Sequence, residues 1–379
     1  VWDISSKNAR EGGIDLVIPE FSLAWGDPSF YGSTWDFHKK LALVPDGNLI
    51  MADIYQGTLV SMGRDGSLPE EGWNTARNGR RKGLRPSNYL PFDPLRYPYF
   101  HFGPDGSLYV SGGQSNYETR YSQYNLEVGQ DRLSGRFEFP IEGDRSSYVW
   151  KFKLKPGPKL ERLGVIGGFK EASGIVVDGD HIIVADAGNN RLRVCTIEGK
   201  EIASITHYMD QGTKKPIFAP TALAVDRDKC LYVLIGSEQR PKDPRSERTK
   251  PAVQRVLETG AFQPPEPPRS LIKLKSWKAP ELVAKSAPVN TNAMQIAVDA
   301  GVTPPIVWLA NGAGAGNLQK LSGEDLTIQA QWQDDGTKLS NPRQDSGMSI
   351  LNIDPETGHV YVEDDASYRS KTYGTVYRL

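Results

Sequence analysis

The sequence predicts an all-β protein built from a repeated antiparallel unit. Three observations lead to this prediction. The 379 residues include 38 glycines and 27 prolines, so many short elements joined by turns are expected. Apolar residues make up 38% of the chain, which is enough for a packed core, yet no apolar run is long enough to span a bilayer. Finally, one hairpin pattern recurs six times along the chain.

Each copy of the pattern consists of an apolar strand, a tight turn and a second apolar strand that ends in a small or acidic residue. The turns contain Pro, Asp, Gly and Asn, which tolerate the backbone angles of tight turns, and the flanks are β-branched or aromatic. Each copy is therefore expected to form a β-hairpin. The six segments are 41–53, 100–112, 173–186, 221–236, 294–312 and 350–364.

A third strand follows each hairpin, and a fourth closes several units. The third strands are expected at 58–62, 148–154, 191–197, 270–275, 317–322 and 375–379, and fourth strands at 201–208 and 327–333. Four antiparallel strands repeated about six times predict a six-bladed β-propeller.

One unit carries a more specific motif. Residues 176–202, VVDGDHIIVADAGNNRLRVCTIEGKEI, resemble the NHL repeat, and VAD-x-x-NNR-L is the specific part. The other five units match more loosely, chiefly in the turn and the second strand. The resemblance covers roughly residues 37–379 and implies an NHL-like propeller, without implying any one activity.

The ends of the chain suggest how the ring closes. The last unit stops after its third strand, and the alternating segment GIDLVIPEF at 13–21 can supply the missing fourth. We therefore expect a single propeller domain over residues 1–379 whose open edge is covered by this N-terminal strand. The alternative is that residues 1–36 form a separate arm.

Long connections are predicted on one face of the ring. Segments 113–147 and 237–269 follow second strands, and 67–97 leads into a first strand, so all three belong to the same face. Residues 249–260 within one of them have the pattern of a short amphipathic helix. These connections form either a rim over the central channel or packing decoration.

Aromatic and acidic residues suggest a ligand site on this long-loop face. Trp25, Trp35 and Asp36 precede the first predicted blade, and Tyr208, Asp210 and Trp332 lie at comparable junctions. Aromatic platforms beside carboxylates suit a small molecule, a sugar or a peptide. The leading expectation is thus a binding or interaction module, with such a ligand or a protein as its partner. The alternative is that these rings fill the interface where the N-terminal strand docks.

Histidines suggest a second possibility, a metal-dependent lyase or hydrolase. His38, His101 and His207 fall at or near connections of the long-loop face in three different blades. Three imidazoles with an open position can hold a catalytic zinc ion. The arrangement resembles, by topology alone, the zinc site of the peptidyl-hydroxyglycine amidating lyase, an NHL-type propeller. Isolated histidines, however, also serve as ordinary polar residues.

Acids at the ends of second strands offer another metal set. Asp53, Asp186 and Asp364 occupy this position, and such oxygen ligands suit Ca²⁺. In this choice of ligands the set resembles the site of six-bladed lactonases of the gluconolactonase type, which hold a divalent ion with such groups. The alternative for Asp53 and Asp186 is structural, because the Asp of VAD can cap the following turn through backbone N–H groups.

Composition argues against other classes. The net charge of −1 does not favour nucleic acid binding, and no membrane partner is expected. An RNA-binding NHL module is the last alternative, resting on a basic cluster at Arg77, Arg80, Arg81, Lys82 and Arg85. Two cysteines exclude a disulfide framework. The chain begins with Val1, from which we expect an extracytoplasmic protein, secreted or periplasmic.

Overall fold

The computed structural model describes residues 16–18, 39–43, 49–53, 58–62, 99–103, 105–111, 148–155, 159–236, 269–289, 293–311, 317–333, 348–353, 358–364 and 375–378. These residues form antiparallel sheets. No helix among them is long and apolar enough to cross a membrane.

Three of the sheets lie in the first half of the chain. The first contains β2 (Lys39–Leu43), β3 (Leu49–Asp53) and β4 (Thr58–Met62). The second contains β5 (Tyr99–Phe102), β6 (Ser107–Ser111), β7 (Val149–Lys155) and β8 (Lys159–Ile166). The third contains β9 (Ala172–Asp178), β10 (His181–Asp186), β11 (Arg191–Thr196) and β12 (Glu201–Ile205).

Three further sheets follow, each with four strands. One contains β15 (Ala222–Val225), β16 (Leu231–Ile235), β17 (Ser270–Leu274) and β18 (Leu282–Lys285). The next contains β19 (Ala293–Asp299), β20 (Ile306–Asn311), β21 (Asn317–Ser322) and β22 (Ile328–Gln333). The last contains β23 (Met348–Ile353), β24 (Val360–Asp364), β25 (Thr375–Arg378) and β1 (Leu16–Ile18).

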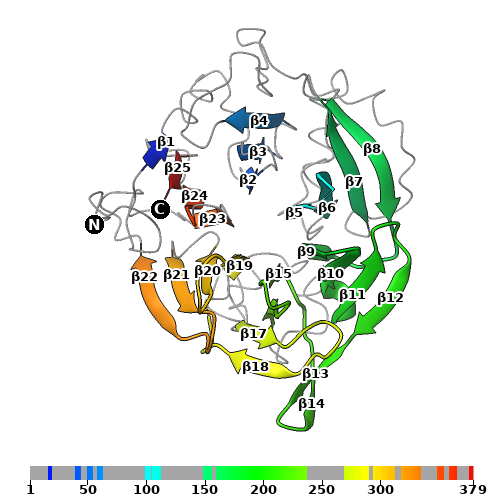
Figure 1. Cartoon of the computed structure of the whole chain (residues 1–379), viewed down its shortest axis with the longest axis vertical. Helices are drawn as coiled ribbons and strands as arrows, with labels where there is room; N and C mark the ends of the chain where they lie inside the picture. Colours follow the sequence, from blue (N-terminus) through cyan, green and yellow to red (C-terminus); the bar gives the residue numbers. More distant parts are fainter. Residues whose placement is uncertain are drawn as a thin grey trace, which may run out of the picture.

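These sheets are arranged in a ring, which makes the fold a β-propeller. The first strand of each sheet contacts that of the next, in the order β2, β5, β9, β15, β19 and β23, and β23 contacts β2. Figure 1 shows the sheets radiating around a common centre, with these strands innermost. All six predicted hairpins are present as strand pairs.

The N-terminal strand joins the C-terminal sheet, as expected. β1 pairs antiparallel with β25, from Leu16 opposite Arg378 to Ile18 opposite Val376. The described strand, Leu16–Ile18, lies within the predicted range 13–21, whose other residues are outside the described part of the chain. The sheet of β23, β24 and β25 therefore has its fourth strand supplied from the other end of the chain, which leaves β25 without an open edge.

The apolar core lies between neighbouring sheets. Alternate residues of β10 serve two interfaces, because successive side chains of a strand point to opposite faces. Ile182 and Val184 pack toward the β5–β8 sheet, whereas Ile183 and Ala185 pack toward the β15–β18 sheet. Such doubly covered strands read as continuous apolar runs in the sequence.

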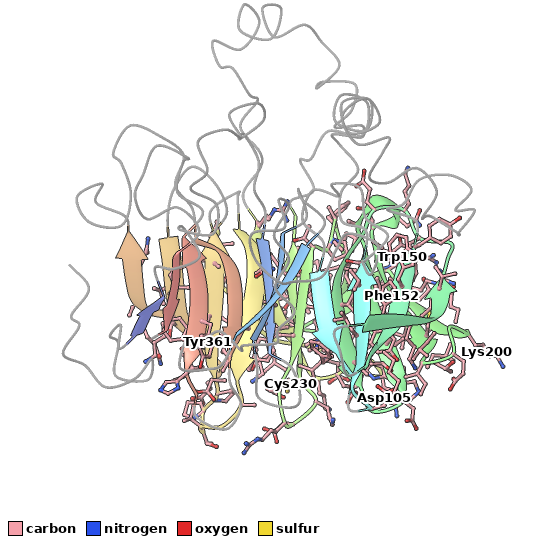
Figure 2. The ribbon with its side chains drawn as sticks, turned by 90° about the horizontal axis from the view of Figure 1, so that it is seen from above. Asp105, Trp150, Phe152, Lys200, Cys230 and Tyr361 are labelled. Atoms are coloured by element: carbon pink, nitrogen blue, oxygen red, sulfur yellow. The ribbon has the colours of Figure 1, made fainter. Side chains whose placement is uncertain are left out.

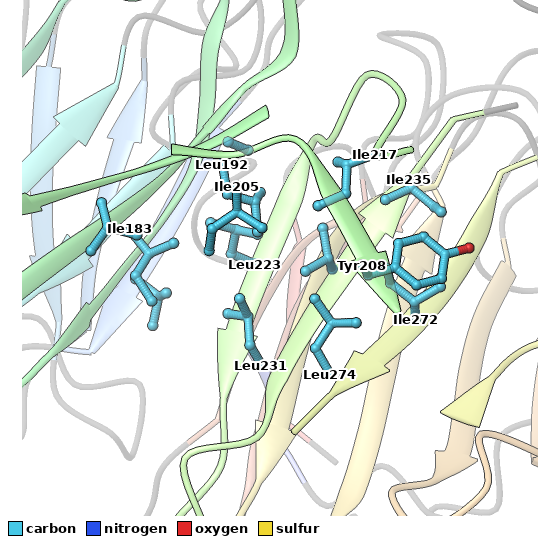
Figure 3. Packing of buried hydrophobic residues seen from close by; sticks show 14 residues of the cluster. Ile183, Leu192, Ile205, Tyr208, Ile217, Leu223, Leu231, Ile235, Ile272 and Leu274 are labelled. Carbon is cyan, nitrogen blue, oxygen red and sulfur yellow. The ribbon is translucent and has the colours of Figure 1, made fainter. Parts of the chain in front are cut away.

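The interface between the β9–β12 and β15–β18 sheets is shown in Figure 3. Ile183, Leu192 and Ile205 come from one sheet, and Leu231 and Leu274 from the other. A second cluster joins the β15–β18 and β19–β22 sheets in the same manner. The ring is thus held together by a series of similar interfaces.

One predicted strand is wrong in its extent. Residues 201–208 were expected to form one fourth strand, but β12 ends at Ile205 and a separate hairpin follows, β13 (His207–Asp210) and β14 (Thr213–Pro216). Gln211 and Gly212 have positive φ values of 47° and 81°, which is the backbone of a two-residue hairpin turn. In Figure 1 this hairpin projects from the outer rim of the ring.

The two ends of the sheets define two faces. In Figure 2, Asp105 and Cys230, which belong to connections between first and second strands, lie at the lower end of the strands. Each of these connections follows the innermost strand of its sheet. The innermost strands therefore end at the lower end and begin at the opposite end. We call the end where they begin the upper face and the other end the lower face.

Candidate functional site at the upper face

The Asp of the VAD motif is a buried structural acceptor. Asp186 is fully buried at the end of β10. Its Oδ1 accepts the backbone N–H of Lys170 at 2.7 Å, and its Oδ2 accepts Asn189 Nδ2 at 2.9 Å and Arg191 Nε at 2.7 Å. Its carboxylate therefore already has three donors. This arrangement matches the capping alternative for Asp186 more closely than the metal alternative.

The rest of the motif is also used in the fold. Asn190 follows the 3-10 turn η4 (Ala187–Asn189) and has a left-handed φ of 52°, a conformation that asparagine tolerates well. Its Oδ1 accepts the backbone N–H of Ala219 at 2.9 Å, which ties this turn to the segment leading into β15. Leu192 is fully buried in the interface toward the β15–β18 sheet.

This turn fixes the backbone that leads into β9. Besides the Lys170 N–H bond to Asp186, Gly188 N donates to the Lys170 carbonyl at 2.8 Å, and Ala187 N donates to the Glu171 carbonyl at 3.3 Å. Gly188 is required here, because a Cβ at this position would lie 2.8 Å from the Lys170 carbonyl oxygen. The motif thus holds Lys170 and Glu171 in one defined conformation.

Glu171 is the unusual residue in this arrangement. Its φ is 58°, in the left-handed region that side chains other than Gly and Asn avoid. The residue is only 7% exposed. Among the described residues, its carboxylate has no hydrogen-bond or salt-bridge partner. A left-handed backbone at a non-glycine residue, with no side-chain partner among the described residues, marks Glu171 as a candidate functional position.

The chain path places Glu171 beside the centre of the ring. It is the last residue before β9, one of the innermost strands in Figure 1, and it lies on the upper face, where β9 begins. The connection that carries it comes from β8, at the outside of the neighbouring sheet. Glu171 therefore lies at the upper end of the innermost strand of its sheet.

Neighbouring polar groups at this end are committed to the fold. Ser111 Oγ donates to the Ser173 carbonyl at 2.6 Å, and Ser173 Oγ lies 3.2 Å from the carbonyls of Ala185 and Pro220. Arg269 Nη1 donates to Thr221 Oγ1 at 2.5 Å. These bonds connect three successive sheets around the upper face.

A second polar cluster lies toward the lower face. Tyr232 Oη lies 3.0 Å from Asp226 Oδ2 and 3.1 Å from the Gly323 carbonyl, to which Lys273 Nζ donates at 2.7 Å. Burial and the nearby Asp226 raise the pKa of Tyr232. Burial likewise raises the pKa of Cys230, which disfavours its thiolate. Since these bonds are internal and join two sheets, we interpret the cluster as structural.

His101 and His207 lie in different environments, and His38 lies outside the described residues. His101 lies in β5 opposite Tyr109, whose ring packs between the β5–β8 and β9–β12 sheets. Burial lowers the pKa of His101 to about 4. His207 is in the outlying β13–β14 hairpin, where its Nδ1 lies 2.8 Å from Thr206 Oγ1.

The predicted aromatic and acidic set is also dispersed. Trp25, Trp35 and Asp36 lie outside the described residues. Tyr208 packs in the core between two sheets and is almost fully buried, and Asp210 sits at the turn of the peripheral hairpin. Trp332 belongs to β22, the last strand of its sheet. The latter three therefore differ from their predicted place beside the channel.

The remaining acids occupy equivalent positions in the fold. Asp53 ends β3 opposite Lys39, and Asp364 ends β24 opposite Met348, so both backbones reach the upper face as Asp186 does. Within the described residues, no three His, Cys, Asp or Glu side chains are close enough to hold a metal ion. The segments 67–97, 113–147 and 237–268, with the basic cluster and the expected helix, lie outside the described residues.

Comparison with known proteins adds a family for one unit. Residues 169–195 match the NHL repeat. No curated protein sequence matches the chain. Among solved structures, a catalytically inactive virginiamycin B lyase from Staphylococcus aureus with quinupristin is 11% identical, with a TM-score of 0.44 over 89% of this chain and 78% of that one.

Two further structures are similar to the same degree. A selenomethionine form of the Staphylococcus aureus enzyme is 12% identical, with a TM-score of 0.43 over 89% of this chain and 78% of that one. A gluconolactonase from Xanthomonas campestris is 13% identical, with a TM-score of 0.41 over 70% of this chain and 68% of that one. The strand arrangement identifies the chain as a β-propeller, and one of its units, residues 169–195, is an NHL repeat.

Proposed function

We propose that this chain is a ligand-binding propeller module whose site lies at the upper end of the central channel. One observation carries the proposal: Glu171 is held in a left-handed conformation at the start of an innermost strand, and its carboxylate has no partner among the described residues. A non-glycine residue in this conformation costs about 1–2 kcal/mol.

We also infer that the propeller has six blades. The support is that the six larger sheets follow one another around the ring and that their innermost strands close a cycle from β23 back to β2. Glu171 would then be one of six equivalent positions around the upper opening. The hydrogen bond from the Lys170 N–H to Asp186 is described for this position among the equivalent ones, so the proposed site is asymmetric within the described residues.

A thermal-shift screen tests the proposed site. The screen would cover amino acids, dipeptides, amines, organic acids and sugars. At a hundredfold excess over Kd, a bound ligand stabilises the folded state by about 2.7 kcal/mol. Ligands that stabilise the protein are expected to lose their effect on Glu171→Gln. Glu198→Gln is the matched control, because Glu198 is exposed in the turn between β11 and β12 on the other face. Ligands that stabilise all three proteins equally would contradict the proposed site.

A stability measurement provides a second readout. If Glu171 serves binding rather than folding, Glu171→Gly should raise the free energy of unfolding by about 1 kcal/mol, because glycine adopts the left-handed conformation without strain. Urea unfolding of the two proteins measures the difference. A clear loss of stability would instead assign Glu171 a structural role.

A metal-dependent lyase or hydrolase is the second candidate. The same carboxylate favours it, since an unpaired Glu oxygen is a ligand that divalent ions accept. This candidate expects purified protein to carry a divalent ion in about one-to-one ratio and Glu171→Gln to lose it. Elemental analysis of both proteins decides between the candidates, and a wild-type protein free of metal after dialysis against Ca²⁺ and Zn²⁺ removes this one.

A further inference from the structure

We infer that the β13–β14 hairpin is a docking arm for an acidic, partly apolar segment of a partner protein. The hairpin projects from the outer rim of the ring, so the inference goes beyond the proposed function and does not depend on it (Figure 1). It starts from the path of the chain. The Ile217 N–H donates to the Thr206 carbonyl at 2.8 Å, so residues 207–216 leave the ring and return to the same point. The connection between β12 and β15 does not need them.

The hairpin is anchored to the ring, although its outer part is exposed. Tyr208 packs in the core between two sheets (Figure 3). Met209 N donates to the Pro280 carbonyl at 2.9 Å, and Met209 forms a parallel bridge with Glu281, just before β18. A two-stranded hairpin alone is at best marginally stable in water, so these contacts hold it in place while residues 211–215 remain exposed. Exposed segments on a fixed scaffold commonly carry binding residues.

Cross-strand pairing sorts the side chains of the hairpin into two faces. Met209 lies opposite Lys214, and Tyr208 lies opposite Lys215. Residues directly opposite each other share a face of the sheet. Because Tyr208 is buried against the ring, the face with Met209 and Lys214 is the outer one. Met209 is 39% exposed, and its flexible thioether suits a surface that adapts to a partner.

Charge indicates the kind of partner. Lys214 and Lys215 are exposed and form no ion pair with the described acids. Lys278, in the β17–β18 turn on which the hairpin rests, is also exposed and lies over the Trp277 ring, with its Nζ 5.2 Å from the centroid. The hairpin and this turn therefore carry three cations that no described acid neutralises. Such a surface is complementary to carboxylates.

A protein segment fits this surface better than a nucleic acid does. Lys214 and Lys215 are neighbours in a strand and point to opposite faces, so they do not line up along one phosphate backbone. On the outer face a cation adjoins an apolar side chain, which matches a segment carrying acidic and apolar residues together. Lysines also protect free strand edges, but edge protection does not require the exposed Met209 beside them.

A fluorescence-anisotropy titration tests the inference. The probe is a fluorescein-labelled peptide of glutamate and leucine, and the control peptide has glutamine in place of glutamate. We expect the wild-type protein to bind the acidic peptide about tenfold more tightly than the control peptide. The double variant Lys214→Glu with Lys215→Glu should lose this preference. The matched double variant Lys153→Glu with Lys200→Glu, at two exposed lysines of other sheets, should keep it.

Further measurements separate the ionic from the apolar contribution. Added NaCl should weaken binding of the acidic peptide, as an ionic contact requires. Met209→Gln should weaken it severalfold and leave its salt dependence unchanged. Thermal unfolding of each variant checks that the protein is folded.

Three results with the peptides would overturn the inference: equal binding of both, no binding of the acidic one, or a preference that survives Lys214→Glu with Lys215→Glu. Fluorescein-labelled single-stranded DNA and vesicles containing phosphatidylserine are the competing probes. Tighter binding of either than of the acidic peptide would assign the hairpin to another class of partner and would also overturn the inference.

Discussion

The β9–β12 sheet differs from three other sheets in the polar interactions that it contains. In β9–β12, the Asp186 turn on the upper face forms hydrogen bonds with Lys170, Asn189 and Arg191. Three other sheets place an aromatic residue of the second strand directly opposite a lysine of the third. The pairs are Tyr109–Lys151, Tyr232–Lys273 and Trp308–Lys320.

In each of these pairs the ammonium lies over the ring, 5.3, 5.4 and 5.8 Å from its centroid. Two of the pairs are accompanied by an acid: Asp105 lies 3.4 Å from Lys151, and Asp226 lies 3.9 Å from Lys273. The matched positions in β9–β12 are the apolar pair Ile183 and Val194. An aromatic ring with a lysine over it thus takes the place of an apolar pair in three sheets.

The difference explains why only one unit is recognised as an NHL repeat. The family match at residues 169–195 covers β9, β10 and most of β11, where the Asp–Asn–Arg turn is present. The other sheets keep the same strand order with another set of polar residues. The strand order is therefore common to the sheets of the ring. The matched repeat, and the hydrogen bonds of the Asp186 turn to Lys170 and Glu171, belong to the β9–β12 sheet.

The largest expected effect concerns the turn of β9–β12. Asp186→Ala should lower the free energy of unfolding by about 3 kcal/mol, because it leaves the Arg191 guanidinium and the Lys170 N–H without their acceptor. Urea unfolding measures the loss. Asp180→Ala, at an exposed position of the same sheet, should change stability by less than about 0.5 kcal/mol. Equal effects of the two substitutions would remove the special role of the turn.

A pH dependence distinguishes β5 from β9. His101 faces Tyr109, whereas the matched residue of β9, Val176, faces Ile183. Burial lowers the pKa of His101 to about 4, against 6.5 for the unfolded chain. Between pH 6.5 and 4 the unfolded state binds a proton that the folded state does not, so stability falls with falling pH. The loss is at most about 3 kcal/mol.

The variant His101→Val makes β5 resemble β9 and tests this contribution. The difference in unfolding free energy between wild type and variant, followed from pH 7.5 to 4, should shrink as the pH falls. A His101→Val profile parallel to that of the wild type would show that His101 is not buried as a neutral group.

The smallest expected effect compares two of the aromatic pairs. Tyr232→Phe should cost about 1–2 kcal/mol, since the hydroxyl contacts both Asp226 and the Gly323 carbonyl. Tyr109→Phe should cost less than about 0.5 kcal/mol, because within the described residues its hydroxyl bonds to no carbonyl or carboxylate. Thermal unfolding of both variants provides the measurement, and a reversed order would mean that ring packing dominates in both sheets.

Much of the ring could be predicted from the sequence, because its signals are local. Turns such as PDGN and PDGS with apolar flanks identify hairpins wherever they occur. The break after Ile205 was missed, although Gln211 and Gly212 form a two-residue turn that the sequence offers at Asp210–Thr213. Tyr208 was misplaced for the same reason, since a strand that leaves the ring at Thr206 anchors its hairpin with this ring in the core.

The candidate site was harder to predict. Glu171 is one of many glutamates, and nothing in the letters FKEAS at 169–173 indicates a left-handed conformation. Its burial and its lack of a partner depend on where the Asp186 turn and β9 lie in space. By contrast, the structural role of Asp186 as a turn cap could be predicted from the motif itself. Two of the donors to its carboxylate, Asn189 and Arg191, are close to Asp186 in the chain.

The pairing of β1 with β25 has a consequence for biosynthesis. The two strands are more than three hundred residues apart in sequence, so their contact is among the most distant that the chain can make. During translation, the sheet of β23 and β24 emerges with a missing neighbour and must wait for β25 and then for a segment made long before. Until then its outer edge is exposed to other chains, and this is the stage at which we expect a chaperone to matter most.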